Sequence, residues 1–180
     1  PGPEARRARA LDKIGAVRFV RCGLEAGPPA PEQHRAVEDA LAICLRSWQG
    51  QDNEGRAVCD DDMIEFFRAS ARSATAVGQL DLSVLYLDGQ PISFIWGMAR
   101  FPVANIAKLA FDPAFKATSP GLVHMARYLE DSIDRGFTAV DFGHEFADYK
   151  RRWSKVGQEL SEYHYYASPR WSRFRKRLQD

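Results

Sequence analysis

The sequence predicts an α/β protein, in which a twisted mixed sheet of about five to seven strands carries helices on both faces. The first observation behind this prediction is a hairpin. Asp88-Gly89 separates two apolar stretches, at residues 80–87 and 91–100, and both turn residues tolerate positive φ. The second is a strand–helix–strand pattern between residues 103 and 142. A hairpin followed by such a crossover builds one sheet with antiparallel and parallel pairs.

The crossover pattern consists of a strand at 103–111, a helix from Ser119 to Arg135, and a short strand over Phe137–Phe142. Ser119 suits the N-cap, because its hydroxyl can accept from the free amides of the first turn. Pro120 suits the first helical position, where no amide hydrogen is needed. The spacing predicts that the helix buries one apolar face, made of Leu122, Met125, Ala126, Leu129 and Ile133.

The remaining elements follow from helical spacing, from alternation and from glycine or proline breaks. The expected helices are at 4–14, 32–48, 60–76 and 169–178, and the expected strands are at 16–22 and 158–166. We expect a single domain.

Composition narrows the class of protein. A net charge of +1, with 45% hydrophobic and 27% charged residues, is typical of a globular protein and makes nucleic acid an unlikely partner. The three cysteines show no CxxC spacing, so neither a metal site nor a disulfide framework is predicted. The sequence has no apolar run long enough to span a membrane. A reducing, cytoplasmic location is the simplest interpretation.

The start of the crossover helix is a candidate anion site. Lys116 and Thr118 precede it, and Gly121 would let a ligand approach the backbone closely. A helix N-terminus offers free amides and a partial positive charge, which suit an anion such as a diphosphate. The alternative is an ordinary capped helix of an α/β domain.

Several short motifs together resemble a known family. The chain resembles GNAT-type acetyltransferases of the CelD-like (BioF2-like) family, which is associated with cellulose and exopolysaccharide biosynthesis and is similar in fold to the Fem aminoacyltransferases. The motifs are Ser47-Trp48-Gln49-Gly50, Phe66-Phe67, Leu87 to Ser93, Phe111-Asp112-Pro113, Ser119-Pro120-Gly121, Asp141-Phe142-Gly143 and Tyr149-Lys150. Family members tend to be about twice as long, so the resemblance implies that this chain is the C-terminal half of a longer protein.

The resemblance implies an acyltransferase that moves an acyl group from acetyl-CoA or another acyl-CoA to an amine or hydroxyl. The acceptor would be a small molecule or a glycan precursor. In the GNAT fold two strands splay apart around the pantetheine arm, and here these would be 103–111 and 137–142. The diphosphate would lie against Lys116, Thr118, Ser119, Gly121 and Leu122.

Acyl transfer to an amine needs a base, a group that stabilises the oxyanion and a proton donor for the departing thiolate. The candidate catalytic residues are Asp141 and Glu145 as bases and Tyr149 as the donor. His144 and Lys150 are candidates for holding the substrate. The alternatives are that the two acids cap a helix, that His144 and Lys150 are surface residues, and that Tyr149 packs in the core.

Two other functions stay open at this point. A Fem-like transferase would take an aminoacyl group from tRNA, and the basic stretch Arg170–Arg177 is its candidate RNA contact. A non-catalytic binding domain would keep the fold and lack the donor. Binding of CoA would distinguish an acyltransferase from this non-catalytic binding domain.

Overall fold

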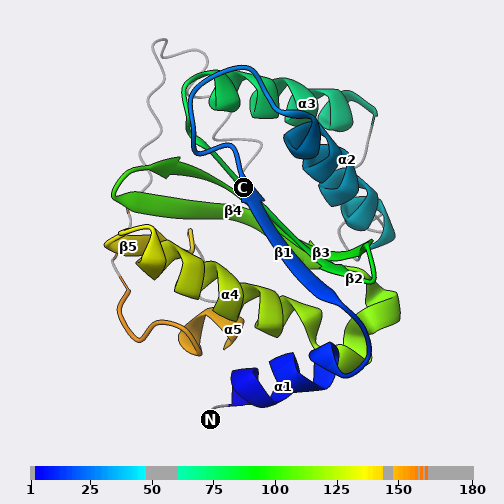
Figure 1. Ribbon diagram of the computed structural model, residues 1–180. Helices are drawn as coiled ribbons and strands as arrows, with labels where there is room; N and C mark the ends of the chain where they lie inside the picture. Colours follow the sequence, from blue (N-terminus) through cyan, green and yellow to red (C-terminus); the bar gives the residue numbers. More distant parts are fainter. Residues whose placement is uncertain (1–2, 48–60, 144–147, 158, 160, 162–180) are drawn as a thin grey trace, which may run out of the picture. The chain divides into compact units, whose positions relative to one another are not determined.

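The computed structural model describes residues 3–47, 61–143, 148–157, 159 and 161 (Figure 1). The chain divides into two units, residues 1–143 and residues 144–180. The strand expected at 158–166 and the helix expected at 169–178 lie outside the described residues, apart from Glu159 and Ser161.

The first unit follows the predicted order of elements. It contains α1 (Pro3–Asp12), β1 (Val17–Cys22), α2 (Pro31–Arg46), α3 (Asp61–Ala76), β2 (Leu80–Leu87), β3 (Gln90–Arg100), β4 (Val103–Phe111), the 3-10 helix η2 (Pro113–Thr118), α4 (Pro120–Asp134) and β5 (Ala139–Asp141). The second unit contains one described helix, α5 (Asp148–Arg151).

The five described strands form one sheet in the order β1-β2-β3-β4-β5. The pairs from β1 to β4 are antiparallel, and β4 pairs with β5 in parallel. The predicted hairpin is confirmed, since Asp88 and Gly89 take φ values of 49° and 78° between β2 and β3. The α4 crossover from β4 to β5 confirms the mixed sheet. The final strand is shorter than expected, with three residues in place of six.

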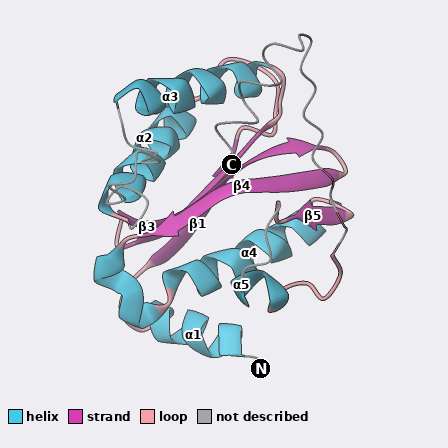
Figure 2. Ribbon diagram, turned by 180° about the vertical axis from the view of Figure 1, so that it is seen from behind, coloured by secondary structure: helices cyan, strands magenta, loops and turns pink. Residues whose placement is uncertain are grey.

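Helices cover both faces of this sheet. Figures 1 and 2 show α2 and α3 on one face and α4 with α1 on the other. On the α2–α3 face the core contains alternate residues of the central strands, such as Leu82, Val84, Phe94 and Trp96. On the other face a smaller cluster joins Leu85 and Ile92 of the sheet to helices α1 and α4. The alternation along β2 and β3 therefore sends side chains into two separate cores.

The apolar face predicted for α4 is correct for Met125, which is buried, and wrong for Leu122 and Ile133. Ile133 is 73% exposed, and Leu122 is only half-buried. The buried stripe instead includes His124, Tyr128 and Ser132, which are spaced four residues apart. The reason is that the sheet under α4 is itself polar, because β2 and β3 present buried Asp81, Ser83 and Ser93 there.

A buried ion pair organises the contact between the sheet and the later half of α4. The guanidinium of Arg21 donates two hydrogen bonds to Asp81, at 2.8 and 2.7 Å, and both side chains are fully buried. The Tyr128 hydroxyl donates to the same carboxylate at 2.7 Å, and its ring lies 4.1 Å from the guanidinium. Burial, followed by the Asp81 charge, raises the pKa of Tyr128. Such a network is stable because each charge has several partners.

A second polar chain crosses the same interface. Ser93 donates its hydroxyl hydrogen to the Ala110 carbonyl at 3.0 Å, so the His124 Nδ1–H donates to Ser93. The Nε2 atom is then the acceptor for the Ser83 hydroxyl, at 2.9 Å. Burial lowers the pKa of His124 to about 3, which keeps the ring neutral. These contacts give His124 a structural role between α4 and the sheet.

Candidate functional site

The parallel strands β4 and β5 pair over three residues each in the described part of the chain. The described pairing matches Val103–Asn105 with Ala139–Asp141, while β4 itself continues to Phe111. Past Asp141 the chain still lies near β4, because a Cβ on Gly143 would be 3.5 Å from the Ile106 carbonyl oxygen. The described pairing with β5 ends six residues before β4 does, and α/β sheets bind ligands beyond the carboxyl ends of their parallel strands.

A β-bulge interrupts β4 at this place. Trp96 of β3 pairs with Lys108 and the next residue, Gly97, pairs with Ile106, so Ala107 is an extra residue on β4. Gly97 is needed opposite the bulge, since the Asn105 carbonyl occupies the position that a Cβ would take. A bulge reverses the alternation of a strand and re-aims its side chains. Lys108 consequently shares a sheet face with Trp96, the face covered by α2 and α3.

Asp141, one of the predicted bases, lies at the end of β5. It pairs with Asn105 in parallel register, so both side chains belong to one face of the sheet. Met98, the antiparallel partner of Asn105, pairs in turn with the core residue Leu80, which identifies that face as the one under α2 and α3. Asp141 is exposed, and its Oδ1 accepts from the Gly143 amide at 2.8 Å. The second carboxylate oxygen faces no described hydrogen-bond donor.

Of the other site candidates, two lie outside the described residues and two belong to the second unit. His144 and Glu145 are outside the described residues. Tyr149, which is 43% exposed, and Lys150 belong to α5 in the second unit. That these four residues gather around Asp141 stays a prediction.

The start of α4 differs from the prediction. Ser119 takes a left-handed conformation, with φ 53° and ψ 53°, and its side chain does not cap the helix. The cause is η2, which ends at Thr118 and leaves one residue to turn the chain into α4. The Leu122 and Val123 amides bond to the Ser119 carbonyl, which uses amides that were expected to be free. The Gly121 amide has no acceptor among the described residues, and a Cβ on Gly121 would contact Phe111 at 3.4 Å.

The loop expected before α4 is the 3-10 helix itself. Lys116 is exposed on it, and the Thr118 hydroxyl donates to the Phe115 carbonyl at 2.8 Å. The Asp112 carboxylate starts η2 by accepting from the Ala114 amide at 3.0 Å, and Arg46 of α2 pairs with it at 2.7 Å. These bonds fix the connection between β4 and α4.

One residue at this helix start was not predicted. The Arg7 guanidinium, on α1, donates to the Ser119 hydroxyl. It therefore places a cation at the positive end of the α4 dipole, an arrangement that a bound anion would stabilise. Arg7 and Ser119 are 112 residues apart in the chain. No local pattern in the sequence reveals this contact.

A small apolar gap of about 10 Å³, room for about one water molecule, lies on the α2–α3 face beside the bulge. Its lining consists of Ala40, Leu41, Cys44, Phe67, Phe94, Trp96 and Lys108. The Phe67 and Trp96 rings meet edge to face with centroids 5.3 Å apart, and the Lys108 amine lies 5.9 Å from the Phe67 centroid. No carboxylate in the described part of the chain forms an ion pair with Lys108.

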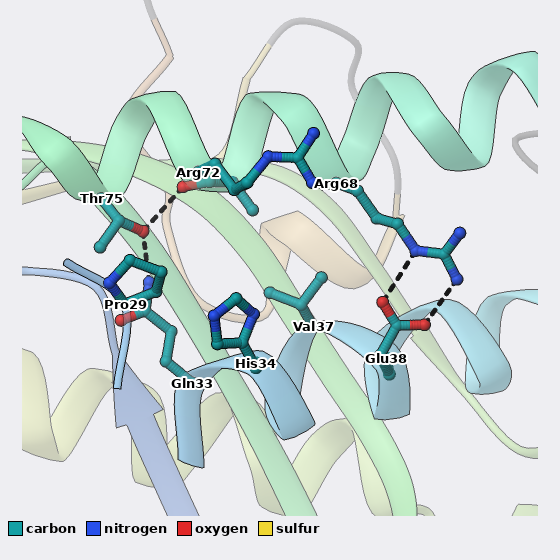
Figure 3. Close-up of a pocket in the computed structure, with 9 residues that line it drawn as sticks. Pro29, Gln33, His34, Val37, Glu38, Arg68, Arg72 and Thr75 are labelled. Carbon is teal, nitrogen blue, oxygen red and sulfur yellow. Dashed lines mark hydrogen bonds and ion pairs between the residues drawn. The ribbon is translucent and has the colours of Figure 1, made fainter. Parts of the chain in front are cut away.

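A second hollow lies between α2 and α3 (Figure 3). Four of its polar side chains form two pairs, Gln33 with Thr75 and Arg68 with Glu38. Gln33 donates to Thr75, which donates to the Ala71 carbonyl, and Arg68 holds Glu38 through two bonds of 2.8 and 2.7 Å. The bond to Arg68 lowers the pKa of Glu38. These contacts tie the two helices together, which explains the hollow as a structural seam.

The described residues contain neither a candidate metal site nor a helix that could span a membrane. No group of three or more His, Cys, Asp or Glu side chains there could hold a metal ion. No described helix is long and apolar enough to cross a membrane. Cys22 is a free thiol, and burial, followed by the nearby Glu32 and Asp81, raises its pKa to about 12.

Comparison with protein families identifies the class. The family described as "Acetyltransferase (GNAT) domain" matches residues 5–151, which is most of the chain. The chain therefore belongs to this family of acetyltransferase domains. A comparison with curated protein sequences gave no match.

Solved structures share the fold at low sequence identity. The acetyltransferase AAC(6')-Iy, in complex with a CoA bisubstrate analogue, is 10% identical with a TM-score of 0.56, covering 85% of this chain and 100% of its own. An aminoglycoside acetyltransferase from an uncultured soil metagenomic sample is 10% identical with a TM-score of 0.54, covering 84% and 97%. An N-acetyltransferase described as putative, from Lactobacillus plantarum, is 15% identical with a TM-score of 0.51, covering 82% and 92%. These similarities establish the fold.

Proposed function

We propose that this protein is an acyl-CoA-dependent acyltransferase of the GNAT type, with acetyl-CoA or another acyl-CoA as donor. The observation that carries the proposal is the β4–β5 junction. Its described pairing covers three residues on each strand, and β4 continues through a β-bulge to Phe111, which lies next to Gly121 near the start of α4. A pantetheine arm can lie where two strands separate, with its thioester near the bulged backbone.

The donor's diphosphate would lie against the start of α4. The proposed contacts are Lys116, Thr118, Ser119, Gly121 and Leu122, to which the structure adds Arg7 as a support. Because Ser119 engages the Leu122 and Val123 amides, the Gly121 amide and the two cations would supply most of the attraction. The site would attract the diphosphate mainly through charge, because residues 113–121 contain a single glycine, Gly121.

The residues at the end of β5 would carry the chemistry. Asp141, assisted by Glu145, would take a proton from the acceptor's ammonium group. The amine nitrogen would then bond to the thioester carbon, the carbon–sulfur bond would break, and Tyr149 would give its proton to the thiolate. The Tyr149 phenolate would take back the proton that the new amide nitrogen loses. His144 and Lys150 would hold the acceptor. Asp141 suits this role because one of its oxygens is fixed by Gly143 and the carboxylate is exposed.

The acceptor would be an amine or hydroxyl of a small molecule or a glycan precursor, in keeping with the resemblance to CelD-like enzymes and the Fem-related fold. We place the reaction in the cytoplasm. The chain would act as the C-terminal half of a longer protein. Titration calorimetry with CoA and acetyl-CoA tests the donor. Saturable 1:1 binding by the folded chain supports the proposal, and no binding at millimolar CoA contradicts it.

A further inference from the structure

We propose that Arg46, the last residue of α2, sets the affinity of the donor site by neutralising the buried carboxylate of Asp112, so that the site accepts the phosphates of an acyl-CoA. Arg46 is then a positioning residue, because it acts on the donor through Asp112. This inference rests on the proposed acyltransferase function and adds an electrostatic determinant of donor specificity. It arises from one ion pair and from the place of that pair beside the start of α4.

Asp112 lies next to the segment proposed to hold the diphosphate. Its neighbour Phe111 packs near Gly121, since a Cβ on Gly121 would be 3.4 Å from the Phe111 ring. The Asp112 side chain also begins η2, the helix that carries Lys116 and ends at the residue before Ser119. A negative charge on Asp112 therefore acts on a ligand at the start of α4, because a buried charge is poorly screened by salt and solvent.

The Asp112 carboxylate is buried and has one cationic partner. Its side chain is 7% exposed. One oxygen accepts from the Ala114 amide at 3.0 Å, and the other accepts from the Arg46 Nε at 2.7 Å. No other cation in the described part of the chain forms an ion pair with it. Arg46 thus supplies the charge that balances this carboxylate.

The balance matters because the proposed donor is strongly anionic. CoA carries about four negative charges at neutral pH, two on the diphosphate and about two on the 3′-phosphate. The cations proposed to attract them are Lys116 and Arg7, and both are exposed. An unbalanced carboxylate on Asp112 would cancel the charge of one of these two cations. With Arg46 in place, both act on the phosphates in full.

A different explanation is that the ion pair is only a mechanical tie between α2 and the connection from β4 to α4. Such a tie needs the hydrogen bond, whereas neutralisation needs the charge. The two can be separated because the bond uses Nε. Arg46→Gln puts an amide nitrogen near the place of Nε, so it can keep the bond without the charge. Arg46→Lys keeps the charge and lacks a donor at that place.

The binding test compares CoA with pantetheine, which has the same arm and no phosphate. NMR titration of the full chain measures both dissociation constants. Arg46→Gln should bind CoA about tenfold more weakly than the wild type and pantetheine equally well, because only CoA meets the exposed charge of Asp112. Arg46→Lys should bind CoA nearly as the wild type does. An unchanged CoA affinity in Arg46→Gln, or an equal loss for both ligands, would overturn the inference.

A second substitution should rescue the first. Asp112→Asn removes the negative charge, and its amide oxygen can still accept from the Ala114 amide. The double variant Arg46→Gln/Asp112→Asn should therefore recover the CoA affinity of the wild type. Asp112→Asn alone should bind CoA at least as tightly as the wild type, since Arg46 then adds a positive charge. A folded double variant that still binds CoA weakly would contradict the account.

Arg68→Gln is the matched control. Arg68 also donates from Nε to a carboxylate, that of Glu38, at 2.8 Å, and its side chain is 35% exposed against 43% for Arg46. It lies in the seam between α2 and α3, so its loss should leave the affinities for CoA and pantetheine as they are. The control removes the same charge from the protein as a whole. Thermal melts verify that each variant folds.

Inorganic diphosphate, as a third probe, separates this inference from the proposed function. If the wild type binds CoA and Arg46→Gln binds it equally well, the neutralisation is wrong and the acyltransferase proposal stands. If diphosphate binds more weakly to Arg46→Gln than to the wild type and CoA does not bind, the neutralisation stands and the proposed function fails. If the wild type binds neither, both fail.

Discussion

The two faces of the sheet use polar residues in opposite ways. Under α4, Arg21, Asp81 and Tyr128 are buried and satisfy one another. On the α2–α3 face, the half-buried Lys108 lies near the Phe67 ring, and the exposed Asp141 carboxylate has one oxygen without a described donor. A closed polar network contributes to the fold, whereas polar groups with unused bonding capacity are available to a ligand. The difference locates the proposed chemistry on the α2–α3 face.

Asp81→Ala should produce the largest change in stability. It leaves the Arg21 guanidinium buried without its main partner, which typically costs about 3–5 kcal/mol in the free energy of unfolding. Urea unfolding monitored by circular dichroism measures the loss. Arg18→Ala, which breaks an exposed pair with Glu32, is the control and should cost about 1 kcal/mol or less. Equal losses in the two variants would show that the buried network does not stabilise the fold as described.

Asp141→Asn should give the largest change in activity with little change in stability. We expect turnover to fall about a hundredfold with CoA affinity unchanged, because an amide cannot accept the proton. Release of free thiol from acetyl-CoA measures turnover. Asp134→Asn, at the exposed end of α4, is the control. Unchanged turnover in Asp141→Asn would remove this residue from the mechanism.

Gly121→Val should weaken CoA binding about tenfold or more. The new side chain would stand over the start of α4, where a diphosphate needs close approach to the backbone. Because a Cβ there contacts Phe111 at 3.4 Å, Gly121→Ala provides a milder variant that tests the fold. Calorimetric titration of both, each with a thermal melt, gives the comparison. If Gly121→Val folds and binds CoA as tightly as the wild type, the donor lies elsewhere.

His124 should make stability depend on pH. Its pKa is about 3 in the folded protein and about 6.5 when unfolded, so the unfolded chain binds more protons between these values. The stability contributed by the neutral ring is complete above pH 6.5 and is lost as the pH falls towards 3. The expected slope is at most about 1.4 kcal/mol per pH unit.

Urea unfolding from pH 7 to pH 4 would show a flatter dependence in His124→Asn than in the wild type. His34→Asn, at an exposed histidine on α2, should leave the slope as it is. If the two variants have the same slope, His124 is protonated in the folded protein and the proposed neutral tautomer is wrong.

Local signals in the sequence predicted most of the fold. The Asp88-Gly89 turn and the crossover from β4 to β5 were correct because turn chemistry and helical spacing act over a few residues. The buried face of α4 was partly wrong because apolar spacing cannot reveal that the sheet beneath is polar. The role of Ser119 as a cap was wrong because η2 occupies the segment before it.

The candidate site was less predictable, since it depends on distant contacts. Arg7 reaches Ser119 from the first helix, and Lys108 is re-aimed by a bulge whose cause, Gly97, lies on another strand. Asp141 was predicted from its position at a strand end, which is a local signal. The grouping of Glu145, Tyr149 and Lys150 with it stays a prediction.

Backbone amide NMR of the chain on addition of CoA tests the central claim most directly. The account predicts chemical-shift changes concentrated at Asn105–Ala110 of β4 and at Lys116–Val123, with little change in the seam between α2 and α3 around Gln33, Glu38 and Thr75. Shifts confined to that seam, with β4 and the start of α4 unaffected, would contradict it.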